Sequence, residues 1–257
     1  MMFEGRVAVV TGAAGGLGRA IALMLAARGA KAVIGLNRNA DSLNDIAHRL
    51  NHPGFVVDVT DRKAFGEAVA VIVAEFGTID ILVTAAGILQ PPPLSIESVS
   101  ERQFDKIVDV NFKGTWNALS LVGAGMVRRG TGSIVTIASI TGLEPGPLVP
   151  YGPTKAAIME MTKSFAGAWG KSNVRVNCVA PGFTETPALV RGVSFGLIDL
   201  AQLAAATALQ RLPTADEVAE AVCFLASDQA SGITGAVLPV DCGALAMPGF
   251  RGLERPA

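Results

Sequence analysis

The chain has 257 residues, of which 50% are apolar and 17% charged, and its formal net charge is −1. A chain of this length buries a sizeable core, and an α/β sheet of this size often forms one domain. The nearly neutral charge offers no basic surface for nucleic acid or for an anionic membrane, so we predict neither as a partner. The 29 glycines and the high apolar fraction suit a parallel sheet buried on both faces.

Metal binding, secretion and membrane insertion are also disfavoured. The three cysteines (Cys178, Cys223 and Cys242) are far apart, and with only His48 and His52 as histidines no zinc-site spacing can be assembled. We therefore expect buried, reduced thiols and no metal. The N-terminus lacks the basic and apolar regions of a signal peptide, and no apolar run approaches the roughly 20 residues that span a bilayer. These features predict a soluble cytoplasmic protein.

Short β-branched runs alternate with longer helical patterns along the chain. The predicted strands cover residues 6–11, 32–36, 54–58, 79–84, 133–137, 174–180 and 236–240. The predicted helices lie near 17–28, 41–50, 62–75, 101–128, 152–170 and 214–226. Strands that alternate with helices form right-handed βαβ units. The pattern therefore predicts an α/β fold, a Rossmann-type doubly wound sheet of seven parallel strands with helices on both faces.

Nothing in the sequence divides the chain, which has no internal repeat, low-complexity tract or linker. We therefore predict a single domain over residues 1–257. Residues 183–212 form the one long segment without a clean period, between the last two strands of the sheet. We expect a flap there, within the domain, that covers the substrate, because ligands bind in the crevice of such sheets. Thr214 and Glu217 form a predicted capping box at the start of the last helix.

A glycine-rich turn at residues 11–18, TGAAGGLG, joins the first predicted strand to the first predicted helix. Glycines there let the backbone turn tightly and approach a pyrophosphate, whose charge lies against the helix N-terminus. Tight turns also collect glycine, so the composition alone is weak support. The position between strand and helix is what a phosphate-binding turn requires, and it predicts a dinucleotide site.

The end of the second strand, where the chain reads Asn37-Arg38, should meet the adenosine ribose of the dinucleotide. An acidic residue at position 37 would bind the ribose hydroxyls of NAD and repel a 2′-phosphate. Asn37 removes that repulsion and Arg38 offers a contact to the phosphate, so we favour NADP(H) over NAD(H). Against this choice, Gly15 supplies no second basic side chain, and Arg38 is alternatively a solvated surface charge.

Tyr151, the only tyrosine in the chain, stands four residues before Lys155. A free phenol has a pKa of about 10 and is a poor acid near neutral pH. An ammonium group one helical turn away stabilises the phenolate and lowers its pKa, which makes the pair a proton donor and acceptor for a carbonyl or an alcohol. The same spacing also recurs by chance on helix surfaces, where it means only a solvated tyrosine beside a lysine.

With these motifs in order, the chain resembles the short-chain dehydrogenase/reductase family, in its compact single-domain branch. The glycine turn matches the family's Thr-Gly-x-x-x-Gly-x-Gly at Thr11, Gly12, Gly16 and Gly18. The resemblance runs from the first strand to residues 241–243. The glycine spacing differs from that of the longer epimerase-like branch, which also needs a larger substrate domain.

The resemblance implies a set of site residues. The catalytic residues would be Asn111, Ser139, Tyr151 and Lys155. The cofactor would contact Gly12, Gly16, Leu17, Gly18, Asn37, Arg38, Asp58, Val59, Ala86, Gly87, Tyr151, Lys155, Pro181, Gly182, Thr184 and Thr186. Asn111 is implied to hold a water that links Lys155 to solvent, and is otherwise an unexplained buried amide. Asp58 is implied to contact the adenine, and is equally readable as a turn or capping residue.

The chain departs from the family pattern in three places. The family's Asn-Asn-Ala-Gly after the fourth strand is Thr-Ala-Ala-Gly at residues 84–87, so both amide side chains are lost. The hydrogen bonds with which they support the sheet must be made by other groups or by water. Position 242 is Cys242 where glycine is usual. Pro153 lacks an N–H, and is most easily placed in the first turn of the helix that carries Lys155. None of these changes removes a catalytic group.

The implied function is that of an NAD(P)(H)-dependent oxidoreductase that interconverts a ketone or aldehyde and a secondary alcohol. Tyr151 would be the general acid in reduction and the general base in oxidation. Ser139 would bind the substrate oxygen, while Lys155 would lower the pKa of Tyr151 and bind the nicotinamide ribose. Mainly apolar pocket candidates favour a neutral or apolar small-molecule substrate. They are Ile140, Leu143, Leu148, residues 89–93, Phe183 and residues 189–203.

Two other functions stay open. A 3-oxoacyl-[acyl-carrier-protein] reductase would share the fold and the catalytic residues, and would need a basic surface for its acidic carrier, for which Arg128, Arg129 and Lys171 are the candidates. A non-catalytic dinucleotide-sensing regulator would be free to lose the tyrosine or the lysine, yet this chain keeps both. The resemblance also implies a homotetramer or a homodimer, with the helices near 101–128 and 152–170 at one interface.

Overall fold

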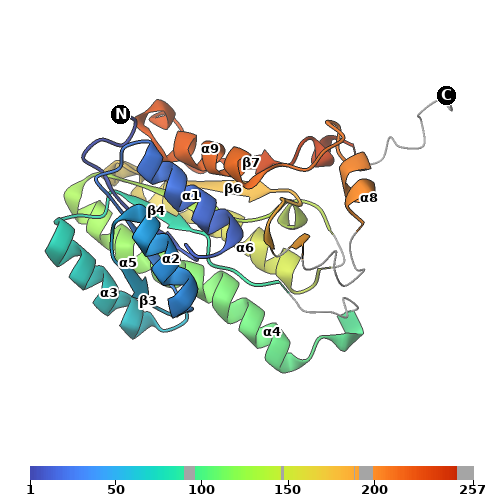
Figure 1. Cartoon of the computed structure of the whole chain (residues 1–257), viewed down its shortest axis with the longest axis horizontal. Helices are drawn as coiled ribbons and strands as arrows, with labels where there is room; N and C mark the ends of the chain where they lie inside the picture. The colour runs from blue at the N-terminus through green and yellow to red at the C-terminus, as the bar shows by residue number, and fades with distance from the viewer. Residues whose placement is uncertain (90–95, 146–147, 188, 191–198, 248–257) are drawn as a thin grey trace.

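The computed structural model describes residues 1–89, 96–145, 148–187, 189–190 and 199–247. It contains the predicted sheet, whose seven strands lie in the order β3-β2-β1-β4-β5-β6-β7 (Figure 1). Every pairing is parallel, which confirms the doubly wound α/β fold. The strands are β1 (Val7–Thr11), β2 (Ala32–Asn37), β3 (Gly54–Val56), β4 (Ile81–Thr84), β5 (Gly132–Ile137), β6 (Val174–Pro181) and β7 (Val237–Val240).

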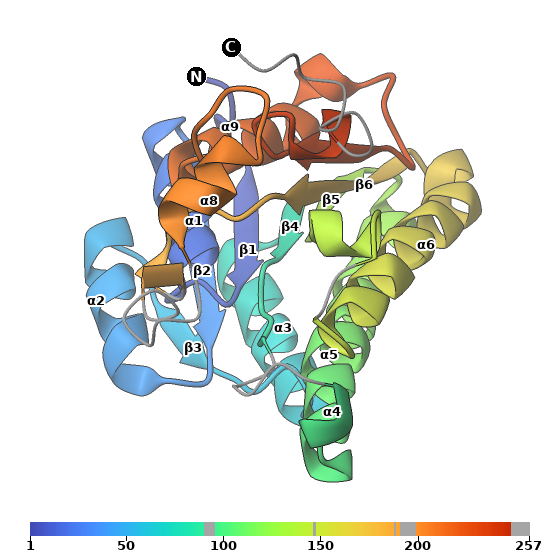
Figure 2. The same cartoon turned by 90° about the vertical axis from the view of Figure 1, so that its right-hand side faces the viewer.

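Helices cover both faces of the sheet (Figure 2). Side chains alternate along β1, so that Ala8 and Val10 join the core on one face while Val7 and Val9 join the core on the other. All of β1 is therefore buried, as the high apolar fraction indicated. The first face is covered by α1 (Gly16–Ala27), α2 (Ala40–Leu50) and α9 (Ala215–Ala226), and the second by α3 (Arg62–Phe76), α5 (Gly114–Arg129) and α6 (Tyr151–Trp169).

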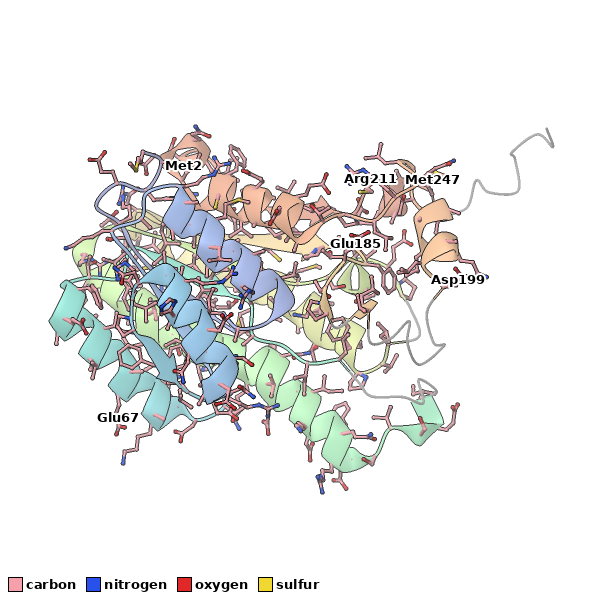
Figure 3. All side chains as sticks on the ribbon, in the orientation of Figure 1. Met2, Glu67, Glu185, Asp199, Arg211 and Met247 are labelled. Atoms are coloured by element: carbon pink, nitrogen blue, oxygen red, sulfur yellow. The ribbon has the colours of Figure 1, made fainter. Side chains whose placement is uncertain are left out.

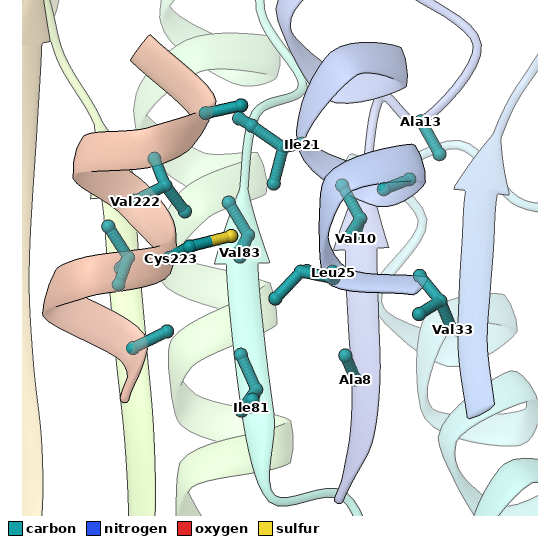
Figure 4. Packing of buried hydrophobic residues seen from close by; sticks show 14 of the residues in the cluster. Ala8, Val10, Ala13, Ile21, Leu25, Val33, Ile81, Val83, Val222 and Cys223 are labelled. Atoms are coloured by element: carbon teal, nitrogen blue, oxygen red, sulfur yellow. The ribbon is translucent and has the colours of Figure 1, made fainter. Parts of the chain in front are cut away.

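The core of the first face lies between α1, α9 and the central strands, as Figure 4 shows. Ile21 and Leu25 of α1 and Val222 and Cys223 of α9 are buried against Val10 of β1 and its neighbours. Each large aliphatic side chain buried in this way stabilises the fold by ~1.5–3 kcal/mol. This packing holds the start of α1, and with it the glycine turn, against the end of β1.

The predicted helix over 101–128 is wrong in one respect, because the structure divides it. α4 (Glu101–Ile107) runs into a π-helical turn at Val108–Lys113, and α5 follows. Within this region the Thr115 hydroxyl donates to the carbonyl oxygen of Asn111 at 2.7 Å. Hydrophobic periodicity does not reveal a single wide turn, since the apolar face continues through it. π-helical turns are frequent at functional sites, and this one carries Asn111.

The other predicted boundaries agree with the observed ones to within two residues. The capping box is confirmed, because the Thr214 hydroxyl accepts the Glu217 N–H at 3.2 Å and the Glu217 carboxylate accepts the Thr214 N–H at 2.9 Å. Two backbone N–H groups at the start of α9, which have no partner within the helix, are therefore hydrogen-bonded.

The predicted flap at 183–212 is described in part, and the remainder lies outside the described residues. It contains a short helix that the sequence analysis missed, α8 (Leu200–Ala205), whose N-terminus is capped by the Asp199 side chain. Glu185 and Arg211 lie with Asp199 at one end of the molecule (Figure 3). That this segment covers a substrate stays a prediction.

Candidate active site

The parallel strands bring the predicted site residues to one edge of the sheet. The carboxyl ends of parallel strands share an edge, and open α/β sheets bind their ligands in the crevice outside it. Predicted site residues lie at or just beyond the ends of six of the strands at this edge, namely Gly12, Asn37, Asp58, Ala86, Ser139 and Gly182.

Tyr151 begins α6, and Lys155 follows one turn later. Pro153 stands between them in the first turn, where a backbone N–H has no intrahelical partner, so its predicted placement is confirmed. Lys155 is only 5% exposed, its Nζ donates to the carbonyl oxygen of Ile137 at 2.9 Å, and it lies 5.4 Å from the centroid of the Tyr151 ring. The pair therefore belongs to a built site and is not a solvated surface pair.

Ser139 lies just beyond β5, before a 3-10 turn at Ile140–Gly142. Its hydroxyl oxygen accepts the Thr141 N–H at 3.3 Å and the Thr141 hydroxyl at 3.0 Å. The turn packs tightly on α6, since a Cβ placed on Gly142 would approach the α6 backbone to 2.6 Å. This close packing holds Ser139 beside Tyr151, where the Ser139 side chain acts to lower the pKa of the phenol.

Asn111 is fully buried in the π-helical turn. Its carboxamide oxygen accepts the Ile88 N–H at 2.8 Å, and its Nδ2 donates to the Ile88 carbonyl at 3.1 Å and to the Thr154 hydroxyl at 3.2 Å. The amide is thus a buried polar group with a full set of partners. The implied role of Asn111 in holding a water for Lys155 stays a prediction.

Burial dominates the ionisation of the catalytic pair. It raises the pKa of Tyr151 to about 12, and the hydrogen bond with Ser139 offsets only part of this rise. It lowers the pKa of Lys155 to about 8, with a smaller opposing effect from Cys178. Burial thus outweighs the lowering effect on the Tyr151 pKa, because lost hydration destabilises the phenolate. That Lys155 lowers the pKa of Tyr151 stays a prediction.

The glycine turn has the close contacts that a dinucleotide site needs. A Cβ on Gly12, whose φ is +68°, would lie 2.8 Å from the backbone of Ala86, and a Cβ on Gly18 would overlap the Gly12 carbonyl oxygen. A Cβ on Gly16 would lie 2.8 Å from the Thr186 side chain. α1 begins here with no acidic residue in its first turn, so its N–H groups and its dipole favour a pyrophosphate. The residues present therefore fit a dinucleotide.

A cleft of about 460 Å³ lies beyond the ends of β2 and β3. Its lining combines three cationic side chains, Arg38 and, from α4, Arg102 and Lys106, with four carboxylates that include Asp58. Asp58 Oδ1 accepts the Thr60 N–H at 2.9 Å and the Thr60 hydroxyl at 2.8 Å, which shows a turn-forming role. Burial acts to raise the pKa of the Asp58 carboxyl, but these bonds and the charges of Arg38 and Lys106 lower it overall.

Three predicted cofactor residues are accounted for by local structure or by the core. The Asn37 side-chain oxygen accepts the Arg38 N–H at 2.9 Å, so it faces its own backbone. Val59 is 8% exposed, and its carbonyl accepts a bond from Asn117 Nδ2 at 2.9 Å. Leu17 packs against the core of the first face. Contacts of these residues with a dinucleotide stay predictions.

The segments after β4 and β6 flank Ser139, because β5 lies between these two strands in the sheet. Gly87 lies beside the catalytic lysine, since a Cβ there would be 3.5 Å from the lysine Nζ. β6 ends at Pro181, and the Thr184 hydroxyl donates to the Gly182 carbonyl at 3.0 Å. The backbone after both strands is therefore close to the atoms that would react.

Where the family has Asn-Asn, this chain has Thr84-Ala85, and one buried polar atom of this pair is unpaired among the described residues. Thr84 Oγ1 is buried, and among the described residues it has no hydrogen-bond partner. Thr84 pairs with Thr11 of β1 and with Thr136 of β5 across the sheet. The Thr11 hydroxyl accepts the Ala86 N–H at 3.2 Å, which joins the loop after β4 to β1. How the family's network is replaced stays a prediction.

Sequence reasoning missed three residues. Thr154 bonds to Asn111, and Arg102 and Lys106 line the cleft beside Arg38. The signal for Thr154 was its place in the first turn of the catalytic helix. No local signal marks Arg102 or Lys106, because α4 approaches the ends of β2 and β3 only through the fold.

Within the part of the chain that the structure describes, no helix is long and apolar enough to cross a membrane. Among the same residues, no group of three or more His, Cys, Asp or Glu side chains could hold a metal ion. The cysteines are free thiols; Cys178 and Cys223 are buried as expected, whereas Cys242 is partly exposed.

The dinucleotide turn and the buried phenol of Tyr151 meet at the same edge of the sheet. A proton donor beside such a turn defines an oxidoreductase that uses a nicotinamide dinucleotide. The chain belongs to the short-chain dehydrogenase/reductase family, and the family model described as enoyl-(acyl carrier protein) reductase matches residues 12–244.

Comparisons with individual proteins agree with this family assignment. The 3-oxoacyl-[acyl-carrier-protein] reductase of Thermotoga maritima is 38% identical over 255 residues, 95% of this chain and 99% of the relative. The cis-4-hydroxycyclohexanecarboxylate dehydrogenase of Sinomonas cyclohexanicum is 38% identical over 251 residues, 94% and 97% of the two chains. The structure of ElxO with NADP bound has a TM-score of 0.88 at 30% identity, covering 94% and 99%. NAD⁺-bound xylitol dehydrogenase has a TM-score of 0.89 at 29% identity, covering 95% and 100%.

The two relatives and xylitol dehydrogenase are enzymes by name, so the comparisons support an oxidoreductase and give no support to a non-catalytic regulator. They also support a nicotinamide dinucleotide as the cofactor. Because one solved structure holds NADP and another NAD⁺, they do not distinguish the two.

Proposed function

We propose that the protein is an NADP(H)-dependent oxidoreductase that interconverts a neutral or apolar ketone or aldehyde and the corresponding alcohol. The observation that carries this proposal is the group formed by Ser139, Tyr151 and Lys155. The Ser139 side chain lies close enough to the Tyr151 phenol to act on its pKa, and a buried ammonium lies 5.4 Å from the ring centroid. Two donors for one substrate oxygen and one transferable proton are what carbonyl reduction requires.

In the direction of reduction, the Ser139 hydroxyl and the Tyr151 phenol donate hydrogen bonds to the substrate carbonyl oxygen. The raised pKa keeps Tyr151 protonated near neutral pH, and the phenol releases its proton as the alkoxide develops. Lys155 stabilises the phenolate that is left. The nicotinamide, when bound, supplies the hydride in reduction and accepts it in oxidation. In oxidation, the phenolate of Tyr151 is the base.

Apolar surface at the edge of the sheet supports a neutral or apolar substrate. Leu89, Leu143 and Phe183 follow β4, β5 and β6, and Leu200 begins α8. These four side chains are 37–48% exposed. Exposed apolar residues gathered at one edge mark a binding surface, whereas scattered ones need no explanation. The remaining candidates at 90–93 and 191–198 lie outside the described residues.

For the cofactor we infer NADP(H), from the charges at the cleft beyond β2 and β3. Arg38 and Lys106 both line it, and position 37 is an amide that does not repel a 2′-phosphate. Within the described residues, neither Arg38 nor Lys106 makes a salt bridge, so both charges can meet a phosphate. The NADP-bound ElxO structure is consistent with this choice.

A second candidate is reduction of a 3-oxoacyl group on an acyl carrier protein, the activity named for the Thermotoga maritima relative. The predicted basic surface supports it only weakly. Arg129 donates to a backbone carbonyl at 2.7 Å and lies 3.8 Å from the Asp80 carboxylate, so its charge is engaged inside the subunit. Arg128 lies in the last turn of α5 before β5, and Lys171 follows α6 before β6, so both lie at the edge opposite Tyr151.

We further propose a homotetramer or a homodimer whose interface uses α5 and α6. Phe112 and Trp116 are 37% and 48% exposed. The Trp116 ring centroid lies 5.4 Å from that of Phe165, which lies 4.3 Å from that of Trp169. Exposed aromatic rings that continue across two helices suit a subunit interface. Light scattering should show an oligomer that Trp116→Glu dissociates. Cytoplasmic location stays a prediction.

A panel of free ketones and secondary alcohols, each assayed with NADPH and with NADH, tests the proposed function. We expect turnover of neutral, apolar ketones, with kcat/KM about tenfold or more higher for NADPH, because two cations would contact the phosphate. The same 3-oxoacyl group should also be presented as a small thioester and on a carrier protein. Turnover of only the carrier-linked group would favour the second candidate, and no turnover of any carbonyl would contradict both.

A further inference from the structure

Thr154 occupies the first turn of α6, between Tyr151 and Lys155. It is 5% exposed, and its side-chain hydroxyl makes two hydrogen bonds. The hydroxyl donates to the backbone carbonyl of Tyr151 at 2.7 Å and accepts from Asn111 Nδ2 at 3.2 Å. One side chain therefore connects the start of the catalytic helix to the π-helical turn.

The connection continues to the loop after β4. Asn111 bonds to both backbone groups of Ile88, at 2.8 Å and 3.1 Å. The neighbouring Gly87 is in contact range of both partners, since a Cβ there would lie 3.4 Å from Asn111 Oδ1 and 3.5 Å from Lys155 Nζ. The loop that Asn111 holds is thus the loop that borders the ammonium of Lys155.

The Thr154 hydroxyl is needed to complete this arrangement. Asn111 Nδ2 carries two protons; one is bonded to Ile88 and the other to Thr154. Asn111 is 0% exposed, so water cannot replace a lost acceptor unless the packing opens. An unpaired amide proton would favour rotation of the Asn111 side chain, and that rotation would release Ile88 and the loop beside Lys155.

We propose that Thr154 is a positioning residue, whose hydroxyl ties the first turn of α6 through Asn111 to the loop after β4 and so holds Tyr151 and Lys155 in register. The inference rests on the proposed function of these two residues in proton transfer. It assigns Thr154 no contact with the substrate. Its contribution is to keep the phenol and the ammonium where Ser139 and the substrate oxygen can use them.

The chain contains a matched control in the same helix. Thr162 is also fully buried in α6, and its hydroxyl donates to the carbonyl of Ile158 at 2.9 Å and bonds to the Thr136 hydroxyl at 2.7 Å. It therefore shares with Thr154 the residue type, the helix, the burial, a bond to its own helix and a bond to one side chain. Thr162 lacks the connection to Asn111.

The test compares Thr154→Val, Thr154→Ser and Thr162→Val. We expect Thr154→Val to lower kcat about 10- to 100-fold with the KM of the coenzyme nearly unchanged, while Thr154→Ser restores most of the activity and Thr162→Val keeps it. Tyr151 is the only tyrosine, so the ultraviolet absorbance of the phenolate reports its ionisation directly. In Thr154→Val the midpoint of the Tyr151 titration should fall from about 12 toward 10, because loosening the first turn of α6 admits water to the phenol.

Equal losses of activity in Thr154→Val and Thr162→Val would overturn the proposal, as would a Thr154→Val enzyme that is less stable yet fully active. If Thr154→Val does not fold, Thr154→Cys replaces it, and a Cys variant as active as Thr154→Ser would overturn the proposal. If the wild type reduces no carbonyl, the proposed function fails, and the tyrosine titration still decides the inference. An unchanged titration midpoint in the valine variant would then refute it.

Discussion

The ammonium of Lys155 lies 5.4 Å from the centre of the Tyr151 ring, one helical turn away and almost without exposure to water. Burial moves the two groups in opposite directions, with the phenol pKa raised to about 12 and the ammonium pKa lowered to about 8. Near neutral pH the phenol therefore keeps its proton while most of the lysine is charged. This is the state that a proton donor for carbonyl reduction needs.

Replacement of Tyr151 by phenylalanine should remove turnover while leaving the site intact. The change keeps the ring and deletes the proton, so kcat should fall ~10²–10⁴-fold or more. Coenzyme affinity, measured by fluorescence titration, should stay within a few fold because the glycine turn is untouched. Near-normal turnover in this variant would show that Tyr151 is not the acid.

Stability should depend on pH through Lys155. Its pKa is about 8 in the fold and 10.5 when unfolded, so between these values the unfolded chain binds more protons and stability rises with pH. Over this pH range the free energy of unfolding of the wild type should rise by up to about 3 kcal/mol relative to that of Lys155→Met. Tyr151, at about 12 in the fold and 10.0 unfolded, contributes in the opposite sense, so stability falls from pH 10 to 12. Urea unfolding at several pH values measures both effects, and parallel curves for wild type and Lys155→Met would contradict the first.

Gly18→Ala should damage the dinucleotide site, because the added Cβ overlaps the carbonyl oxygen of Gly12. We expect coenzyme affinity to fall at least tenfold, since the turn must open to relieve the contact. Gly66→Ala is the control. Outside its own helix, the described atom that the added Cβ would approach is a Leu121 carbon at 3.9 Å, and in α3 the change should raise stability by ~0.5–1 kcal/mol. Calorimetric titration with coenzyme measures the affinity of each variant. Equal coenzyme affinities of Gly18→Ala and Gly66→Ala would exclude a role for the glycine turn in dinucleotide binding.

Asn37→Asp should shift coenzyme preference from NADPH toward NADH. A carboxylate keeps the acceptor for the Arg38 N–H but repels a 2′-phosphate, so the ratio of kcat/KM values should move about 10- to 100-fold. Asn39→Asp places the same charge two residues away, where Asn39 caps α2, and should leave the ratio nearly unchanged. An equal shift in both variants would point to a general charge effect.

Arg175→Met should destabilise the fold without changing the chemistry. The guanidinium donates to the carbonyls of Leu225 at 2.7 Å and Ser227 at 2.9 Å and to the Ser133 hydroxyl at 3.1 Å, at the edge of the sheet away from Tyr151. Unpaired carbonyls at the end of α9 should lower the free energy of unfolding by ~2–4 kcal/mol in urea titrations. The exposed Arg49→Met should change it by less than about 0.5 kcal/mol. A loss of kcat at full stability would argue against this purely structural role.

Most of the sheet and the core of the site could be predicted from local patterns. The strands alternate with helices at clear periods, the glycine turn stands between β1 and α1, and Tyr151 and Lys155 are separated by one helical turn. The helix at 101–128 was predicted as continuous, because a π-helical turn at Val108–Lys113 leaves the apolar period intact. That turn is evident only from the backbone of the folded chain.

The roles of two basic side chains also could not be predicted from local sequence patterns. Arg129 was a candidate for a basic surface, yet it is held beside Asp80, and Lys106 was not considered, yet it lines the cleft with Arg38. Both outcomes depend on segments more than 40 residues apart in the chain, which no local period relates.

The sequence by itself determined that this chain folds as a doubly wound sheet with a dinucleotide turn and a tyrosine–lysine pair, since these features depend on spacings of a few residues. Only the tertiary structure decided how that pair ionises. Packing of α6 against β5, the 3-10 turn and the loop after β4 removes water from Tyr151 and Lys155, and this lost hydration raises the pKa of the phenol and lowers that of the ammonium.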